Sequence, residues 1–266
     1  MTTGIVIVSG ASQGIGRLVS LYLLEHYPEI SVITISRSEA LLLALKKESE
    51  VFGPDRLHIV TGDIAENKTQ DAAISLIPKN QPLLAVINNA AQCQPNCHIL
   101  EVSHDQWTRI LSTNLLAPMN LLSKCHPMLS ASQGRVINIT SSTSQGPVPG
   151  FGAYGVTKVA MNYVSAAMAI EYPDITTIAF YPGVVETAMN DVALNAAEMY
   201  AADPQTVKAG IDMTKVIAKL KTPIPPDVPC AMIANLAMNA NRCLSGKFIT
   251  VDSSEAEEYK APAISN

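Results

Sequence analysis

Short runs of apolar residues recur along the chain, and each ends in small or polar residues that are typical of a turn. Seven runs have the length of a buried strand, and they lie at 4–9, 32–36, 57–61, 83–87, 136–139, 176–180 and 247–251. Most stretches between them carry apolar residues at helical spacing, as Leu18, Leu21 and Leu24 do. Strands and helices that alternate roughly every 20–30 residues predict right-handed crossovers and a parallel sheet covered on both faces. The pattern therefore predicts one doubly wound α/β domain of about seven strands.

The strand pattern stops after residue 186 and resumes only near the C-terminus. Residues 193–199 and 207–220 have helical spacing, and a cluster of prolines follows, up to Pro229. Insertions beyond the carboxyl end of a strand commonly form lids over a cleft, so we expect a substrate lid at about 188–229. We assign residues 1–252 to the domain and 253–266 to a polar C-terminal tail that we expect to be partly disordered.

Composition and charge exclude several classes of protein. A net charge of −5 argues against nucleic acid or an anionic membrane as the partner. No apolar run approaches the ~20 residues of a membrane span, and the first residues lack the basic region of a signal peptide. The five cysteines do not form a disulfide framework, and Cys93, Cys97 and His98 lack a second ligand pair at zinc-site spacing. We therefore expect a soluble, cytoplasmic protein without a metal.

The first strand runs directly into a glycine-rich loop, residues 9–16, with the sequence SGASQGIG. Gly10 permits a tight turn, Gly14 lets the backbone approach a pyrophosphate, and Gly16 allows close packing of the following helix. The N-terminus of that helix presents free N–H groups and a positive dipole end to phosphates. In this strand–loop–helix context, the spacing predicts a dinucleotide site.

The second strand ends in Ser36, Arg37 and Ser38, where NAD-binding proteins commonly place an acid on the ribose. No acid is present to repel a 2′-phosphate, and a guanidinium could bind one, so we predict NADP(H). Alternatively, Arg37 only begins an exposed helix. Asp63 lies at the carboxyl end of the third strand, where it either contacts the cofactor or caps the helix that starts near Glu66.

Tyr154 and Lys158 are four residues apart, so on a helix their side chains share one face. An ammonium beside a phenol lowers the pKa of that phenol, which would make Tyr154 a general acid near neutral pH. Ser141 lies 13 residues upstream, at a strand end that can bring its hydroxyl beside the phenol. A Tyr-x-x-x-Lys pair also arises by chance on many helices. Asn114 lies inside another helical pattern, and burial there would require hydrogen-bond partners and suggest a role.

Together these stretches resemble the short-chain dehydrogenase/reductase superfamily, from Gly4 to about Asp252. The resemblance rests on six motifs in the family's order, which are residues 9–16, residues 88–91, Asn114, Ser141, Tyr154 with Lys158, and residues 182–187. It implies that Tyr154 protonates a substrate carbonyl oxygen while hydride leaves the nicotinamide, and that Ser141 orients this oxygen. It also implies that Lys158 lowers the tyrosine pKa and holds the nicotinamide ribose, and that Asn114 anchors a water on the proton path.

The resemblance further implies how NADP(H) lies in the cleft. Asp63 and Ile64 flank the adenine, Asn89 lies near the nicotinamide-side ribose, and Val185 and Thr187 bind the carboxamide. The full set of expected cofactor contacts is Gly10, Ser12, Gln13, Gly14, Ile15, Gly16, Ser36, Arg37, Ser38, Asp63, Ile64, Asn89, Ala90, Ala91, Tyr154, Lys158, Pro182, Gly183, Val185 and Thr187.

Three positions depart from the family pattern. Ala91 replaces a glycine near the nicotinamide ribose. Gln13 stands where many NADP-preferring members have a second basic residue, so Arg37, with Arg17, would bear the 2′-phosphate. Residues 252–254 read Asp-Ser-Ser where the family usually has Asp-Gly-Gly.

Within the superfamily, residues 35–38, residues 183–187 and the Pro-rich lid look most like benzil reductases, relatives of sepiapterin reductase that use NADPH on diketones and aryl ketones. We expect an NADPH-dependent carbonyl reductase whose substrate walls come from 93–100, 143–151 and 188–229. An NAD-dependent secondary alcohol dehydrogenase, a sepiapterin or pterin reductase, and a non-catalytic NADP-binding sensor are the alternatives. Family analogy implies a homo-oligomer, either a dimer or a tetramer.

Overall fold

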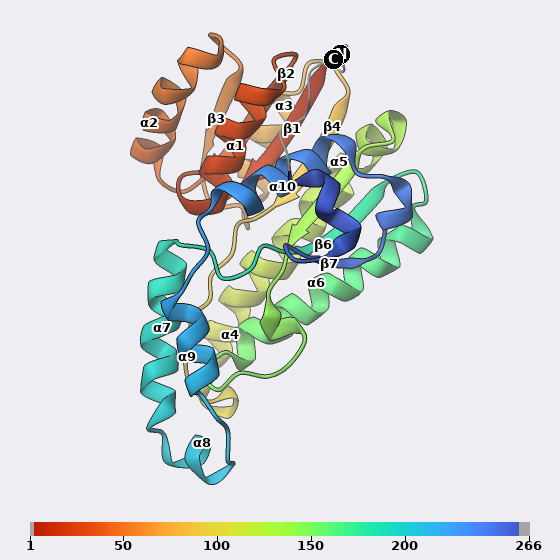
Figure 1. Cartoon of the computed structure of the whole chain (residues 1–266). Coiled ribbons are helices and arrows are strands. Elements are labelled where there is room, and N and C mark those ends of the chain that lie inside the picture. Colours follow the sequence, from red (N-terminus) through yellow and green to blue (C-terminus); the bar gives the residue numbers. More distant parts are fainter. Residues whose placement is uncertain (1–2, 261–266) are drawn as a thin grey trace.

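A seven-stranded parallel sheet forms the centre of the structure, which is a computed structural model that describes residues 3–260 (Figure 1). The strand order is β3-β2-β1-β4-β5-β6-β7, and every neighbouring pair is parallel. The strands are β1 (Gly4–Ser9), β2 (Ile30–Ser36), β3 (Leu57–Thr61), β4 (Leu83–Asn88), β5 (Arg135–Ile139), β6 (Thr176–Tyr181) and β7 (Phe248–Thr250). This order confirms the predicted doubly wound α/β fold.

Two hydrophobic clusters fill the space between the sheet and the helices on its two faces. One face is covered by α1 (Gly14–His26), α2 (Glu39–Ser49) and α10 (Asp227–Asn239). The other is covered by α3 (Asn67–Ser75), α5 (Ala117–Ser132) and α6 (Gly152–Glu171). The remaining helices are α4 (His104–Leu111), α7 (Ala188–Ala201), α8 (Pro204–Lys208) and α9 (Thr214–Lys221).

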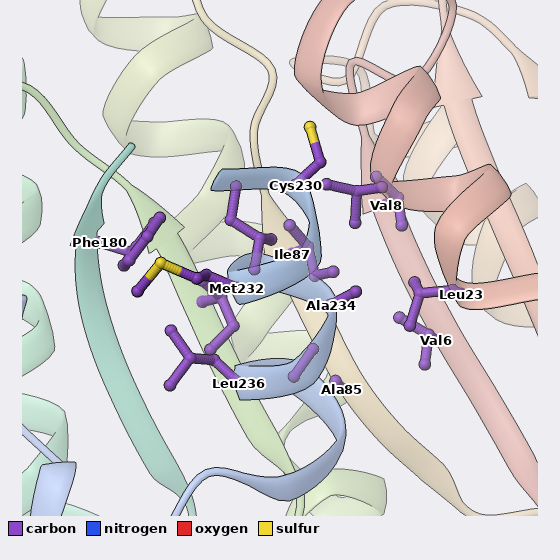
Figure 2. Packing of buried hydrophobic residues seen from close by; sticks show 14 of the residues in the cluster. Val6, Val8, Leu23, Ala85, Ile87, Phe180, Cys230, Met232, Ala234 and Leu236 are labelled. Atoms are coloured by element: carbon purple, nitrogen blue, oxygen red, sulfur yellow. The ribbon is translucent and has the colours of Figure 1, made fainter. Parts of the chain in front are cut away.

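Helix α10 lies at the centre of its face of the sheet, and the sequence pattern did not predict it. All nine residues from Pro229 to Ala237 are buried. Figure 2 shows Met232 directed at Phe180 of β6 and Leu236 on the same side of the helix, while Ala234 lies on the side that faces β1. A helix that is buried all round has no polar stripe, so the helical spacing that marks a surface helix is missing.

The segment after β7 differs from the polar tail that we expected at 253–266. Residues Ser254–Tyr259 form a 3-10 helix in which Ala256 and Tyr259 are buried. The Tyr259 carbonyl oxygen accepts a hydrogen bond from Asn235 Nδ2 at 2.8 Å, and its hydroxyl accepts one from the Asn241 N–H at 3.1 Å. The core therefore extends to Tyr259, because two apolar side chains anchor an otherwise acidic stretch. Residues 261–266 of the expected tail lie outside the described residues.

Helices α7, α8 and α9 extend beyond the carboxyl ends of the strands, at one end of the molecule (Figure 1). The single helix expected at 207–220 is instead divided into α8 and α9. Gly210 lies between them with φ +67°, a left-handed conformation that interrupts a helix. Tyr200 and Met213 are buried and pack together, and this contact holds α7 against the segment that leads into α9.

Candidate active site

A cavity of about 590 Å³ opens at the carboxyl ends of β1, β4, β5 and β6. Strand β1 pairs with β2 on one side and with β4 on the other, so the chain reverses its direction of winding at this point. Ligands of doubly wound sheets bind in the crevice at such a reversal. The position of the cavity is therefore the one that the topology favours.

The glycine loop is held against the loop after β4 by hydrogen bonds from the Asn89 side chain. Asn89 Nδ2 donates to the carbonyl oxygens of Ser9 at 3.0 Å and Gly10 at 3.1 Å. A Cβ on Gly16 would lie 2.5 Å from the Gly10 oxygen and 2.6 Å from Asn89 Nδ2, so only glycine fits there. Gly16 thus packs behind the cavity wall, and the Asn89 amide supports the loop.

The rim formed by the start of α1 fits a pyrophosphate. Gln13, Gly14 and Ile15 line the cavity, and the N-cap residue Gln13 makes no side-chain capping bond. The first N–H groups of the helix therefore remain available to an anion, at the positive end of the helix dipole. Gly14 has φ +55°, and a Cβ there would meet Thr187 at 3.4 Å, so the loop at 182–187 faces the glycine loop across the cavity.

The end of β2 places the guanidinium of Arg37 at the cavity. Arg37 is exposed and lines the cavity, and none of the ion pairs formed within residues 3–260 includes it. Ser36 Oγ donates to Ser12 Oγ at 2.7 Å and so ties β2 to the glycine loop. Arg17 instead pairs with Glu48 of α2 and does not line the cavity, contrary to its expected share in binding a 2′-phosphate.

Asp63 and Ile64 both line the cavity at the end of β3. Asp63 Oδ1 accepts the N–H of Ala65 at 2.9 Å, two residues along the chain, while Glu66 is the N-cap residue of α3. The alternative interpretation of Asp63 as a helix cap is therefore wrong. Its carboxylate forms an Asx-type turn that holds the loop in shape.

Tyr154 and Lys158 lie on the buried face of α6, and both line the cavity with only 8% and 4% of their surface exposed. Lys158 Nζ donates to the Ile139 carbonyl oxygen at 2.7 Å and lies 5.4 Å from the centre of the Tyr154 ring. Burial lowers the pKa of Lys158 to about 8. Burial, followed by the nearby Cys93 thiol, raises the pKa of Tyr154, and a hydrogen bond with Ser141 opposes this rise. The lysine therefore does not produce the lowered tyrosine pKa that we expected, because loss of solvent outweighs its charge.

A turn after β5 carries Ser141 to the cavity. The Ser141 carbonyl accepts from Ser144 Oγ at 2.6 Å, and Asn162 Nδ2 of α6 donates to Ser144 Oγ at 2.9 Å. Thr140 Oγ1 donates to Asn162 Oδ1 at 2.8 Å and completes the link. The position of Ser141 is thus set by hydrogen bonds to the helix that carries the tyrosine.

Asn114 is buried, as a functional asparagine there would be, but it does not line the cavity. It lies in a π-helical turn, Ser112–Leu116, a feature that is frequent at functional sites. Its Nδ2 donates to the Gln92 carbonyl at 2.8 Å and to Thr157 Oγ1 at 3.2 Å, and its Oδ1 accepts the Gln92 N–H at 2.9 Å. Both amide hydrogens are used, so this side chain could hold a water only through the remaining lone pair of its oxygen.

Most of the expected site residues surround this one cavity. Those that do not line it are Gly16, Ser38 and Asn114, and Ser38 is the N-cap residue of α2. The lining residues that were not predicted include Ile35, Gly62, Gln92, Thr113 and Tyr181. Three of them end or follow a strand that the sequence does reveal, so the rule that ligands bind at carboxyl strand ends could have found them.

Residues of α7 and α9 and two loops form the far wall of the cavity. Apolar side chains predominate there, and they include Cys93, Val148, Phe151, Ala193, Val216 and Leu220. His98 Nε2 lies 3.2 Å from Oδ1 of Asp203, the N-cap residue of α8, and the His98 ring meets the Tyr200 ring edge-on at 5.2 Å. Within residues 3–260, no three His, Cys, Asp or Glu side chains cluster as metal ligands would. The His98 ring instead contacts the end of α7 and the start of α8.

Comparison with known proteins agrees with this geometry. Residues 4–198 match the family model of the short chain dehydrogenases. The chain belongs to this family. It is 28% identical over 243 residues to a benzil reductase ((S)-benzoin forming) of Saccharomyces cerevisiae, across 88% of this chain and 90% of that one. It is 29% identical over 209 residues to an NADPH-dependent pterin aldehyde reductase of Arabidopsis thaliana, across 77% and 85% of the two chains.

The crystal structure of the KRED1-Pglu enzyme has the same fold, with a TM-score of 0.81. It is 28% identical in sequence and matches 92% of this chain and all of its own. The protein is therefore a member of an oxidoreductase family whose enzymes bind NAD(P) and act on small molecules, and its relatives include benzil reductases. No helix within residues 3–260 combines the length and the apolar character that crossing a membrane requires.

Proposed function

We propose that the protein is an NADPH-dependent carbonyl reductase that acts on ketones or diketones. The observation that carries this proposal is the convergence of Ser141, Tyr154 and Lys158 on one cavity, opposite the uncapped start of α1. The free N–H groups and the unpaired Arg37 fit the phosphates of NADP(H), and the apolar far wall fits the body of a ketone.

Bound NADPH would supply the hydride, and the residues of the chain would handle the proton. Ser141 donates a hydrogen bond to the substrate carbonyl oxygen, and Tyr154 donates its phenolic proton to the same oxygen. Because burial raises the pKa of Tyr154, the protonated acid form is fully present at neutral pH. Lys158, with a pKa of about 8, is mostly an ammonium at pH 7 and stabilises the phenolate that forms.

The test of the reductase is oxidation of NADPH and NADH with benzil, aliphatic diketones, a β-keto ester and sepiapterin. Tyr154→Phe should lower kcat by roughly 10²- to 10⁴-fold, the usual contribution of a general acid. Tyr172→Phe is a matched control, since Tyr172 is the C-cap residue of α6 and does not line the cavity. Full activity of Tyr154→Phe would mean that the site has been misassigned.

The preference for NADP(H) rests on Arg37. In Arg37→Asp, the ratio of kcat/KM for NADPH to that for NADH should fall by roughly tenfold or more, since a charge-assisted contact is lost and a repulsive one replaces it. An unchanged ratio would favour the alternative of an NAD-dependent secondary alcohol dehydrogenase.

Reduction of a pterin is the second candidate, because the exposed carboxylate of Glu186 lines the cavity and could pair with amino groups of a pterin ring. Asp252, which follows β7, does not line the cavity. Preferential turnover of sepiapterin that is lost in Glu186→Gln would establish this candidate. Binding of NADPH without turnover of any carbonyl compound would instead indicate a sensor.

We also propose that residues 188–229 act as the substrate lid and that the protein forms a homo-oligomer. Helix α6 carries exposed apolar side chains at helical spacing, namely Val156, Val159, Tyr163 and Ile170. Such a stripe is typical of a surface that a second copy covers. Sedimentation analysis of the wild type and of Ile170→Glu would test this, and a cytoplasmic location stays a prediction of the sequence.

A further inference from the structure

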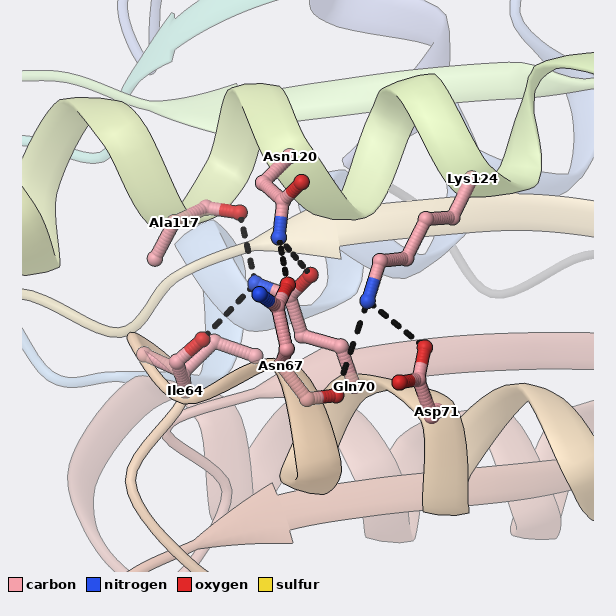
Figure 3. A network of polar contacts seen from close by, with 7 residues as sticks. All are labelled: Ile64, Asn67, Gln70, Asp71, Ala117, Asn120 and Lys124. Carbon is pink, nitrogen blue, oxygen red and sulfur yellow. Dashed lines mark hydrogen bonds and ion pairs between the residues drawn. The ribbon is translucent and has the colours of Figure 1, made fainter.

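A fully buried glutamine joins two segments that border the cavity. Gln70 lies in α3 with no exposed surface. Its Nε2 donates to the carbonyl oxygen of Ile64 at 2.8 Å and to that of Ala117 at 3.1 Å (Figure 3). Both hydrogens of one amide are thus used on backbone groups that are 53 residues apart in the sequence.

The orientation of this amide is determined by its neighbours. Asn120 Nδ2 of α5 donates to Gln70 Oε1 at 2.7 Å and to Asn67 Oδ1 at 2.7 Å (Figure 3). Rotation of the Gln70 amide would break all three of its hydrogen bonds in a buried setting, where unpaired groups are costly. The Gln70 side chain therefore connects α3 and α5 in one fixed orientation.

The two carbonyls that Gln70 holds belong to functional segments. Ile64 lines the cavity in the loop shaped by Asp63. Ala117 directly follows the π turn at Ser112–Leu116, in which Thr113 lines the cavity and Asn114 is buried. Gln70 therefore joins the two segments directly through hydrogen bonds to one side chain.

We propose that Gln70 is a positioning residue that couples the adenine-side loop to the π turn, so that binding of the adenosine half of the cofactor orders the turn carrying Asn114. This proposal rests on the proposed function, because it places the adenine beside Ile64. The coupling is mechanical and needs no contact between Gln70 and the cofactor.

A second bridge between the same helices supplies the matched control. Lys124 Nζ of α5 lies 2.6 Å from Asp71 Oδ1 of α3, in an exposed position (Figure 3). It touches neither the Ile64 carbonyl nor the Ala117 carbonyl. A role confined to holding α3 against α5 would therefore be shared by Lys124, whereas the proposed coupling belongs to Gln70.

The experiment is hydrogen exchange of the full chain with and without 2′,5′-ADP, in the wild type, Gln70→Met and Lys124→Met. In the wild type and Lys124→Met, we expect the ligand to slow exchange at 62–66 and also at 112–117. The effect at 112–117 should be roughly fivefold or more, the lower end of typical coupling between sites. In Gln70→Met, protection at 62–66 should persist while protection at 112–117 is lost.

Protection at 112–117 that persists in Gln70→Met would overturn the proposal, because a direct contact with the ligand would then explain it. Equal loss in Lys124→Met would also overturn it. If Gln70→Met does not fold, Asn120→Leu serves, since it removes one of the three bonds to Gln70, and it should reduce the effect at 112–117 but not at 62–66. An unchanged effect there would count against the coupling. Failure of the wild type to bind 2′,5′-ADP would refute the NADP(H) site itself, whereas absence of ketone turnover would leave this test intact.

Discussion

Lys158 should make the stability of the folded protein depend on pH in an unusual direction. Its pKa is about 8 in the folded protein, against 10.5 for an unperturbed lysine, and burial is the cause. Between these two values the unfolded chain binds a proton that the folded protein does not. Stability therefore rises with pH from about pH 8 to about pH 10.5. Below pH 8 both states are protonated, and the folded state bears the full cost of a buried ammonium.

The size of the effect follows from the shift of 10.5 − 8 = 2.5 units. At about 1.4 kcal/mol per unit, the buried charge costs on the order of 3 kcal/mol at pH 7, and raising the pH to 9 recovers on the order of 1 kcal/mol. Lys158→Met removes this charge, but it also leaves the Ile139 carbonyl without its donor, at a cost of about 1–3 kcal/mol. The two terms partly cancel at pH 7, so the change with pH is the diagnostic quantity.

The assay is urea unfolding of the wild type and Lys158→Met at pH 7 and pH 9, at equal ionic strength. The free energy of unfolding of the wild type, minus that of the variant, should increase by on the order of 1 kcal/mol between the two pH values. Subtracting the two free energies of unfolding cancels the contribution of every titratable group that the wild type and the variant have in common. A difference that is constant, or that falls with pH, would show that folding does not lower the pKa of Lys158 and would refute the reasoning.

Two further predictions concern the glycine loop and the core. Gly16→Ala should abolish binding of NADP(H), measured by fluorescence titration, because the new Cβ would lie 2.5 Å from the Gly10 carbonyl oxygen; binding at wild-type affinity would contradict the packing described for the loop. Leu236→Ala should lower the free energy of unfolding by about 2–5 kcal/mol in urea, because Leu236 is fully buried between α10 and the sheet. A loss below about 1 kcal/mol would mean that α10 is not the core element described above.

The strands and the order of the motifs could be predicted because their signals are local. A buried strand is a short apolar run. The glycine loop is a run of consecutive residues, and Tyr154 and Lys158 are four residues apart on one helix. Helix α10 was missed for the same reason, since a helix that is buried on every side carries no periodic signal. The packing of Tyr259 was missed because one buried aromatic residue in an acidic stretch looks like surface in the sequence.

The sequence by itself determined the α/β class, the parallel sheet, the family and the residues that gather at the cavity, since each follows from neighbouring residues. Only the tertiary structure decided that Arg17 pairs with Glu48, that the Asn114 amide is occupied by Gln92, and that Gln70 joins two distant carbonyls. It also decided the pKa of Tyr154, because desolvation depends on every chain segment packed around the ring, whereas the spacing to Lys158 reports only one neighbouring charge. Partners that are distant in sequence and the loss of solvent are properties of the assembled fold, and no local pattern encodes them.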